Sequence, residues 1–356
     1  MNKTKFLALL IIALMLIILI TGCSKNNSGD ATPETSAPST ENTEVSNKEE
    51  NNASETPENN DAVSEYGVTI NDEDVTFEDY TGEMVTIKKN PERVVCLYNS
   101  YLDIYYSCGG EVVGRVKESE EKPVEESLKA EVVGTSGAPS LEKVLELQPE
   151  LVIMTSGFSG QTEMIPTLKE NNIQVIAIKN DYLEDYYKSV RLFTAITGRE
   201  DLYQEQMDKV KKGVDKIVEK APTDKKYKVL ILFASAKSLT VRNSESMVGE
   251  MLKDLNTINI SDTQTDPSNA KVFSMEKIIQ EDPDFIFVQT MGSDHEKIME
   301  RLKSDAEDNP AWASLKAVKN DKYIVLPKDL YMYKPNDRYP EAYKGLAEIL
   351  YLEVYK

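Results

Sequence analysis

Histidine and glycine-rich loops are scarce in this sequence of 356 residues. The single histidine, His295 in "GSDHEK", argues against a zinc or manganese site built from several imidazoles. The segment "GFSGQ" (157–161) lacks the final glycine of a nucleophile elbow, and neither "GEVVGR" nor "GTSGAPS" has the glycine spacing of a phosphate-binding loop. We therefore expect a protein that is not an enzyme and that has no metal or cofactor of its own.

Positive charge and cysteine are also in short supply. The chain has 41 basic and 61 acidic residues, a formal net charge of −20, which argues against nucleic acid as a partner. Cys96 stands in an apolar run and Cys108 in "SCGG". The sequence leaves two alternatives open for this pair, a disulfide outside the cell or two buried free thiols.

The third cysteine, Cys23, ends a segment with the features of a secretory signal. "MNKTKFLALLIIALMLIILITGC" has two early lysines, an apolar run over 6–20, and small residues before Cys23. A run of this length is short for a membrane span, which needs about 20 residues. We predict a lipoprotein signal peptide at 1–22, cleavage before Cys23 and lipid on its thiol, with an uncleaved signal anchor as the alternative. The predicted location is the outer face of the cell membrane.

Residues 23–65 contain almost nothing that could form a core. Apart from Cys23 the segment is rich in Asn, Ser, Thr, Glu and Pro, with ten acidic and two basic residues. Such a segment buries too little apolar area to offset the entropy lost on ordering. We predict a disordered acidic tether between the lipid anchor and a globular body.

Patterns of strand and helix alternate along the body, which at about 290 residues is long enough for two lobes. Alternation of this kind indicates βαβ units and mainly parallel sheets. The fold class predicted is therefore α/β, with lobes at 66–183 and 224–356. Strands are predicted at 92–98, 150–156, 173–179, 226–235, 284–290 and 322–327, and helices at 140–147, 163–172, 245–255, 296–304 and 340–351.

A helical connector is predicted between the lobes, at 184–223. Its second helix carries one apolar stripe with spacings of four and three residues, and it would be roughly 30 Å long at 1.5 Å per residue. The stripe consists of Tyr203, Met207, Val210, Val214, Ile217 and Ala221. A continuous helix sets the spacing of the lobes and leaves a ligand cleft between them.

Ligands of open α/β sheets bind at the carboxyl ends of the strands. Basic and aromatic side chains at these loops, on an acidic protein, suit a bulky anionic or aromatic ligand. The candidate ligand-binding residues are Tyr98, Asn99, Tyr101, Arg115, Lys117, Ser156, Phe158, Arg242, Met291, Tyr331, Tyr333 and Arg338.

One phrase occurs twice, as "SLEKVLELQPELVIM" (140–154) and "SMEKIIQEDPDFIFV" (274–288). In each copy the serine is a predicted helix N-cap and the glutamate, Glu142 or Glu276, falls in the first turn. The apolar positions that follow are predicted to pack inward: Val144, Leu145, Leu147, Ile278 and Ile279. On the residues alone, both glutamates only stabilise the starts of their helices.

Several features of the chain together resemble the substrate-binding lipoproteins of ABC importers for iron-siderophores, haem and cobalamin. They are the small residues before Cys23 (a lipobox), the predicted tether, the doubled phrase, and the segments "NPERVVCLYNSYLDIYYSCGGEVVG" and "KPNDRYPEAYKGLAEILY". The resemblance covers nearly all of 66–356. It implies two αβ lobes joined by a rigid backbone helix, and a monomer. It also implies that Glu142 and Glu276 contact arginines of the permease dimer.

The resemblance leaves the ligand open. The loops that supply methionine and histidine to haem in related surface proteins read "SGAPSLE" and "NSESMVGEM" here, and Tyr101, Tyr331 and Met247 remain as alternative axial ligands. An intact ferric siderophore needs no protein ligand and is the favoured interpretation. Haem and a corrinoid are the alternatives, as is a surface sensor or adhesion protein that retains the fold.

Overall fold

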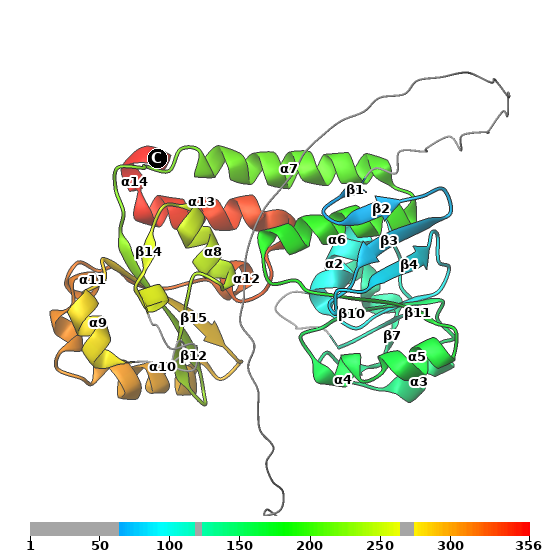
Figure 1. The fold of residues 1–356 in the computed structure, drawn as a ribbon. Coiled ribbons are helices and arrows are strands. Elements are labelled where there is room, and N and C mark those ends of the chain that lie inside the picture. Colours follow the sequence, from blue (N-terminus) through cyan, green and yellow to red (C-terminus); the bar gives the residue numbers. More distant parts are fainter. Residues whose placement is uncertain (1–63, 118–122, 264–273) are drawn as a thin grey trace, which may run out of the picture. The chain divides into compact units, whose positions relative to one another are not determined.

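The computed structural model describes residues 64–117, 123–263 and 274–356 (Figure 1). The predicted signal peptide, Cys23 and nearly all of the predicted tether lie outside the described residues. Within the described ranges, no helix is both long and apolar enough to cross a membrane. Every described residue belongs to one unit, Asn60–Lys356.

The first half of this unit contains a parallel sheet with strand order β11-β10-β5-β6-β7. Its three longest strands match the predicted ones, because each is a short apolar run between turns. The strands are β5 (Val94–Cys96), β6 (Gly114–Arg115), β7 (Glu131–Val132), β10 (Leu151–Thr155) and β11 (Gln174–Ile178). The intervening helices are α2 (Asn99–Ser107), η1 (Glu125–Lys129), α3 (Leu141–Glu146), α4 (Ser159–Thr162) and α5 (Ile165–Glu170).

A four-stranded antiparallel sheet precedes this parallel sheet and was not predicted. Its order is β1-β2-β3-β4, and β2 and β3 pack against helix α6 (Leu183–Thr197). Val75 and Phe77 are buried while their neighbours are not, as expected for a sheet with one face on the core. The antiparallel strands are β1 (Ser64–Glu65), β2 (Val68–Ile70), β3 (Asp74–Glu78), β4 (Met84–Lys88), and a separate hairpin of β8 (Gly134–Thr135) and β9 (Ala138–Pro139).

The second half contains a mixed sheet with order β13-β12-β15-β16. All of its pairs are parallel except β12 with β13, and β14 adds to β12. The strands are β12 (Lys228–Ser235), β13 (Leu239–Arg242), β14 (Ile258–Asn259), β15 (Phe285–Met291) and β16 (Tyr323–Val325). The helices are α8 (Met247–Asp254), η2 (Ile260–Thr263), α9 (Met275–Glu281), α10 (His295–Leu302), η3 (Lys303–Glu307), η4 (Trp312–Ser314), α11 (Lys316–Lys319), α12 (Lys328–Tyr331), η5 (Asn336–Arg338), α13 (Tyr339–Leu350) and α14 (Leu352–Tyr355).

The predicted connecting helices are present as α6 and α7 (Glu200–Val218). Four residues of the predicted stripe are buried on α7 (Tyr203, Met207, Val210 and Val214), Ile217 is partly buried, and Ala221 lies beyond the end of the helix. Helix α7 packs against α13 (Figure 1). Gly213, in the middle of α7, permits this contact, because a Cβ there would lie 2.7 Å from Cγ of Pro340 on α13. A glycine inside a helix costs about 1 kcal/mol relative to alanine, and the close approach of the two helices explains why it is present.

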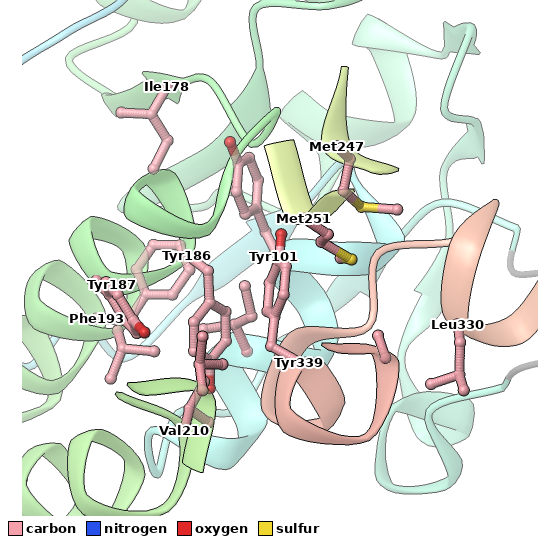
Figure 2. Packing of buried hydrophobic residues seen from close by; sticks show 14 of the residues in the cluster. Tyr101, Ile178, Tyr186, Tyr187, Phe193, Val210, Met247, Met251, Leu330 and Tyr339 are labelled. Atoms are coloured by element: carbon pink, nitrogen blue, oxygen red, sulfur yellow. The ribbon is translucent and has the colours of Figure 1, made fainter. Parts of the chain in front are cut away.

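Apolar side chains form a core that is shared by both halves. Alternate residues of the strands point to opposite faces, so Val94 and Val229 belong to one cluster while Val95 and Leu230 belong to two others. Figure 2 shows the shared cluster, in which Tyr101, Tyr186 and Phe193 from the first half pack with residues of α7, α8 and α13. The two sheets are therefore connected through α6, α7 and α13 by continuous apolar packing.

The cysteine pair is in the reduced form. Cys96 and Cys108 are both buried and are not joined by a disulfide, which agrees with the second of the two alternatives left open by the sequence. Burial raises the pKa of the Cys108 thiol to about 12, so this thiol is neutral at physiological pH.

Candidate functional site: two pockets shared by both halves of the chain

Two adjoining pockets lie where loops from the two halves meet. The first, named here the aromatic pocket, has a volume of about 250 Å³ and is bordered by Tyr98, Phe158 and Tyr333. The second, the polar pocket, has a volume of about 400 Å³ and is bordered by Arg242 and Glu245 among others. Met332 and Lys334 border both pockets, so the two form one continuous site.

The aromatic pocket is built at the carboxyl ends of parallel strands. Tyr98 follows β5 and Phe158 follows β10, and β5 and β10 are paired in the sheet. Their ring centroids are 6.3 Å apart with 61° between the planes, so the two rings form a corner. Burial and the nearby Asp181 raise the pKa of Tyr98 to about 12, which keeps its phenol protonated. Tyr333 closes the pocket from the second half of the chain.

The polar pocket contains a guanidinium held against a ring. Arg242 is the last residue of β13, and its Cζ lies 4.1 Å from the ring centroid of Phe233 on the neighbouring strand β12. Burial lowers the pKa of Arg242, and no carboxylate of the described residues acts on that pKa. A guanidinium that is half-buried and stacked is oriented in advance for a planar anion such as a carboxylate.

Lys334 supplies a second cation at the junction of the two pockets. Its Nζ donates to the backbone carbonyl of Asp181 at 3.4 Å and lies 3.9 Å from a carboxylate oxygen of that residue. Burial lowers the pKa of Lys334, while the carboxylates of Asp181, Asp185 and Glu250 act in the opposite direction. The site therefore presents two cations on a protein whose net charge is strongly negative.

A buried hydrogen-bond network fixes the wall of the aromatic pocket. The Asn336 side chain is 2% exposed and donates to a carboxylate oxygen of Asp103 at 2.6 Å and to the Ser100 carbonyl at 3.2 Å. It accepts from the Ser100 hydroxyl at 2.9 Å, and Asn180 donates to that hydroxyl at 2.8 Å. Because Ser100 and Asp103 belong to α2, this network joins the loop before α13 to the first half of the chain.

Half of the predicted ligand-binding residues border these pockets. Tyr98, Asn99, Phe158 and Tyr333 border the aromatic pocket, and Arg242 and Tyr331 border the polar one. The Tyr331 side chain turns away from the ligand space, because its hydroxyl donates to the Ala342 carbonyl at 2.9 Å. The six that border neither pocket are Tyr101, Arg115, Lys117, Ser156, Met291 and Arg338.

Three of these six have clear structural roles, and we correct the prediction for them. Tyr101 is fully buried, with its ring against Phe193, because its position on α2 faces the core. Arg115 is buried and donates to the Ser127 carbonyl at 2.9 Å, which holds the segment after β6. Arg338 forms ion pairs with Asp329 at 3.0 Å and Glu341 at 2.7 Å, and its charge is therefore already compensated.

Several pocket residues were missed by the sequence analysis. Lys334 and Asn336 are the most important, and both lie in "KPNDRYP". The residues predicted in and just before this segment were Tyr331, Tyr333 and Arg338. The prolines around them were the available signal, because Pro335 prevents the helix from starting before residue 336 and so leaves a loop. Met332 and Asp103 were missed as well.

The two copies of the doubled phrase adopt the same local structure outside this site. Ser140 and Ser274 are both N-caps, but only the Ser140 hydroxyl accepts a bond from a backbone N–H, that of Lys143 at 3.3 Å. Glu142 and Glu276 both lie in first turns and are exposed, whereas Ile279, predicted to pack inward, is 39% exposed. Each helix is followed, directly before a proline, by a residue with positive φ: Gln148 at 46° and Asp282 at 45°.

Metal binding by protein ligands finds no support in the described part of the chain, where no group of three or more His, Cys, Asp or Glu side chains is placed to hold a metal ion. His295 is the exposed first residue of α10 and borders neither pocket. The pockets are therefore suited to a ligand that brings its own chelated metal or contains none.

Comparison with known proteins places the fold and the family. Residues 94–330 match the family described as periplasmic binding protein. The chain is 28% identical over 289 residues to the uncharacterized ABC transporter substrate-binding lipoprotein YvrC of Bacillus subtilis, covering 79% of this chain and 87% of that protein. It is 26% identical over 258 residues to the Fe(3+)-citrate-binding protein YfmC of the same organism, covering 69% of this chain and 76% of the relative.

Solved structures share the fold. Staphylococcus aureus SirA, complexed with staphyloferrin B, superposes with a TM-score of 0.61 at 22% identity over 78% of this chain and 97% of the other. Staphylococcus aureus IsdE, complexed with heme, gives the same TM-score and identity over 73% of this chain and 98% of the other. Taken with the sheets and helices described above, the match over 94–330 shows that the chain belongs to the periplasmic binding protein family, whose members are substrate-binding components of transporters and not enzymes.

Proposed function

We propose that this protein is an extracytoplasmic receptor that captures a ferric siderophore or a similar iron complex and delivers it to the permease of an ABC importer. The observation that carries the proposal is Arg242, whose guanidinium is stacked on Phe233 in a pocket that Lys334 also borders, with Lys334 3.9 Å from a carboxylate oxygen of Asp181. Iron chelates of this kind are bulky and often anionic, and a strongly acidic protein that concentrates two cations in one cleft is suited to them. The relatives named for binding ferric citrate and staphyloferrin B support the same class of ligand.

Membrane anchoring belongs to the proposal. A lipid on Cys23, followed by the acidic tether of residues 24–65, would hold the receptor near its permease while leaving the body free to turn. Two acyl chains are needed for stable attachment, because a single chain binds a bilayer only marginally. The relative YvrC is described as a lipoprotein, which agrees with the pattern before Cys23.

Permease docking through Glu142 and Glu276 is the third part. Both carboxylates are exposed in the first turn of a short helix, and both helices lead into a central strand of their sheet, β10 or β15. Val144 and Ile278, two residues after each glutamate, are buried and hold the helices on the two sheets. The two halves therefore present equivalent acidic contacts, as a permease of two subunits requires.

The test is a binding titration of the purified full chain in detergent. Ferric citrate, a ferric hydroxamate, a ferric catecholate, haemin and cobalamin are compared by calorimetry and tyrosine fluorescence. Tryptophan emission is a poor reporter, because Trp312 is buried against Tyr323 in the outer core of the second half and borders neither pocket. We expect at least one iron chelate to bind at micromolar concentration or tighter. Binding of haemin or cobalamin alone would overturn the assignment to iron chelates.

The arginines provide a matched control. Arg242→Gln removes a guanidinium of the polar pocket on which no carboxylate of the described residues acts, and Arg338→Gln removes one that is already compensated by Asp329 and Glu341. We expect the first variant to weaken binding of an anionic chelate about tenfold or more, since a charge-assisted hydrogen bond contributes about 1.5–3 kcal/mol. Equal affinity of the Arg242 variant and the wild type would show that the anionic ligand binds elsewhere.

A further inference from the structure

The two pockets differ in chemistry, and this difference points to a narrower class of ligand. We propose that the protein selects an iron chelate whose metal-binding groups are single aromatic rings and which also carries a carboxylate. This inference rests on the proposed function, since it assumes that the two pockets hold the transported chelate. It assigns the aryl group to the aromatic pocket and the carboxylate to the polar pocket.

Aromatic side chains form the entrance of the aromatic pocket. Phe158 is 38% exposed, an unusual position for a phenylalanine that follows a fully buried strand. Tyr98 lies against Phe158, with ring centroids 6.3 Å apart, and Tyr333 borders the same cavity of about 250 Å³. Rings prefer edge-to-face or offset contacts, and such contacts add to the free energy of burial. A ligand ring that enters this corner contacts the face of one side chain and the edge of another.

The shape of the corner favours single rings over a porphyrin. The planes of Tyr98 and Phe158 differ by 61°, whereas a flat macrocycle is held best between walls that are nearly parallel. The pocket is also bordered by Asn336, which is 2% exposed and held by three hydrogen bonds. The only histidine of the chain, His295, borders neither pocket. A cavity of about 250 Å³ is of a size for a single substituted benzene ring.

The polar pocket is suited to a carboxylate. Arg242 is fixed against Phe233 at 4.1 Å, and the described residues provide no carboxylate that shifts its pKa. Two parallel N–H groups of a guanidinium match the two oxygens of a carboxylate. Glu245 and Asp181 border the same pocket and would repel further negative charge, so this pocket is suited to one carboxylate, placed at the guanidinium of Arg242.

Lys334 connects the two halves of the ligand. It borders both pockets, which places its ammonium group beside the point where a ring in one pocket is joined to a carboxylate in the other. Iron(III) bound by several catecholate oxygens has a net negative charge, and a cation at the junction offsets it. Asp103 also borders the aromatic pocket, where its carboxylate accepts a hydrogen bond from Asn336 at 2.6 Å.

Four iron(III) complexes separate the two features. The complex of 2,3-dihydroxybenzoylglycine has a ring and a carboxylate, that of N-methyl-2,3-dihydroxybenzamide has the ring alone, citrate has carboxylates alone, and acetohydroxamate has neither. Each is titrated into the full-length protein in detergent by calorimetry, with haemin as a fifth ligand. We expect the first complex to bind at least about tenfold more tightly than each of the others.

Two variants assign each feature to its pocket. Phe158→Leu keeps an apolar side chain but removes the ring, and we expect it to weaken both ring-containing complexes about tenfold without affecting ferric citrate. Arg242→Gln should weaken the two carboxylate-containing complexes clearly more than the benzamide complex, which has no carboxylate to pair with the guanidinium. Arg338→Gln, outside both pockets, is the control and should change none of them. Melting temperatures confirm that each variant is folded.

The outcomes separate this inference from the proposed function. Binding of ferric citrate or ferric acetohydroxamate at least as tightly as the dihydroxybenzoylglycine complex would overturn the ligand class while leaving an iron receptor in place. Tighter binding of haemin would do the same. Failure of all four iron complexes to bind would contradict the proposed function itself.

Discussion

Replacing Asn336 tests whether the hydrogen-bond network at the aromatic pocket stabilises the whole unit. The side chain makes three hydrogen bonds to Ser100 and Asp103, with distances from 2.6 to 3.2 Å, and these bonds join segments more than 200 residues apart. Its backbone has φ of 54°, a left-handed conformation that asparagine and glycine adopt more readily than alanine. Asn336→Ala therefore removes the bonds and adds backbone strain, whereas Asn336→Gly removes the bonds alone.

The expected magnitude follows from these contacts. A hydrogen bond to a charged group contributes about 1.5–3 kcal/mol and a neutral one about 1 kcal/mol. Asn336 borders the aromatic pocket, where water can replace part of what is lost, so the lower end of the sum applies. We expect a loss of about 3 kcal/mol for glycine and, with about 1 kcal/mol of strain added, about 4 kcal/mol for alanine. At about 2 °C per kcal/mol for a protein of this size, the melting temperature should fall by about 6 and 8 °C.

The assay is thermal unfolding by calorimetry, with urea unfolding as a check. Asn172→Ala is a matched control, because Asn172 has φ of 58°, is exposed, and has no side-chain hydrogen bond among the described residues. It should lose only the strain, about 1 kcal/mol. If both Asn336 variants melt within about 2 °C of the Asn172 variant, the network does not stabilise the unit and our reasoning is wrong.

Three further predictions address docking, anchoring and pH dependence. Glu142→Ala and Glu276→Ala should leave ligand affinity and melting temperature unchanged but lower ligand-stimulated ATPase activity in the reconstituted transporter. The double variant should show the largest loss. Normal transport by the double variant would mean that both glutamates only stabilise the starts of their helices. Cys23→Ala should release a folded body from the membrane or leave an unprocessed precursor, and unchanged fractionation with normal cleavage would contradict the lipid anchor. Burial raises the pKa of the Glu250 carboxyl, so the folded state binds that proton more tightly than the unfolded chain, and the ionised form destabilises the fold at neutral pH. Glu250→Gln keeps an oxygen that can accept the hydrogen bond from the Leu183 N–H. It should therefore raise the melting temperature at pH 7.5, and the difference in melting temperature from the wild type should vanish toward about pH 4. An equal gain at both pH values would show that ionisation is not the cause.

The parallel strands could be predicted because burial on both faces produces continuous apolar runs. "LVIM" in β10 and "FIFV" in β15 are such runs, and the helices beside them carry apolar stripes at helical spacing. The antiparallel strands β1 to β4 escaped prediction because they are short and only one face is buried. Their sequences, such as "DVTFE" in β3, mix polar and apolar residues and resemble loop segments.

Predictions of the site were less complete, for reasons that concern side-chain direction. The rule that ligands bind at the carboxyl ends of strands selected Tyr98, Phe158 and Arg242, which border the two pockets. It could not separate Tyr98 from Tyr101, which lie on the same segment but point toward the pocket and toward the core. Nor could it foresee that Arg338 is occupied by two carboxylates while Lys334, four residues earlier, reaches both pockets.

The sequence by itself determined the α/β class, the connecting helices and the repeated helix starts, because periodicity and capping are local properties that few other structures satisfy. It also determined, through its composition, that the chain has no histidine-rich metal site. Only the tertiary structure decided which polar groups meet. Ser100 and Asn336 are 236 positions apart, and their contact depends on the packing of α13 against α7, which brings the loop before α13 onto α2. Such a contact has no local signature, since it arises from the packing of the entire chain.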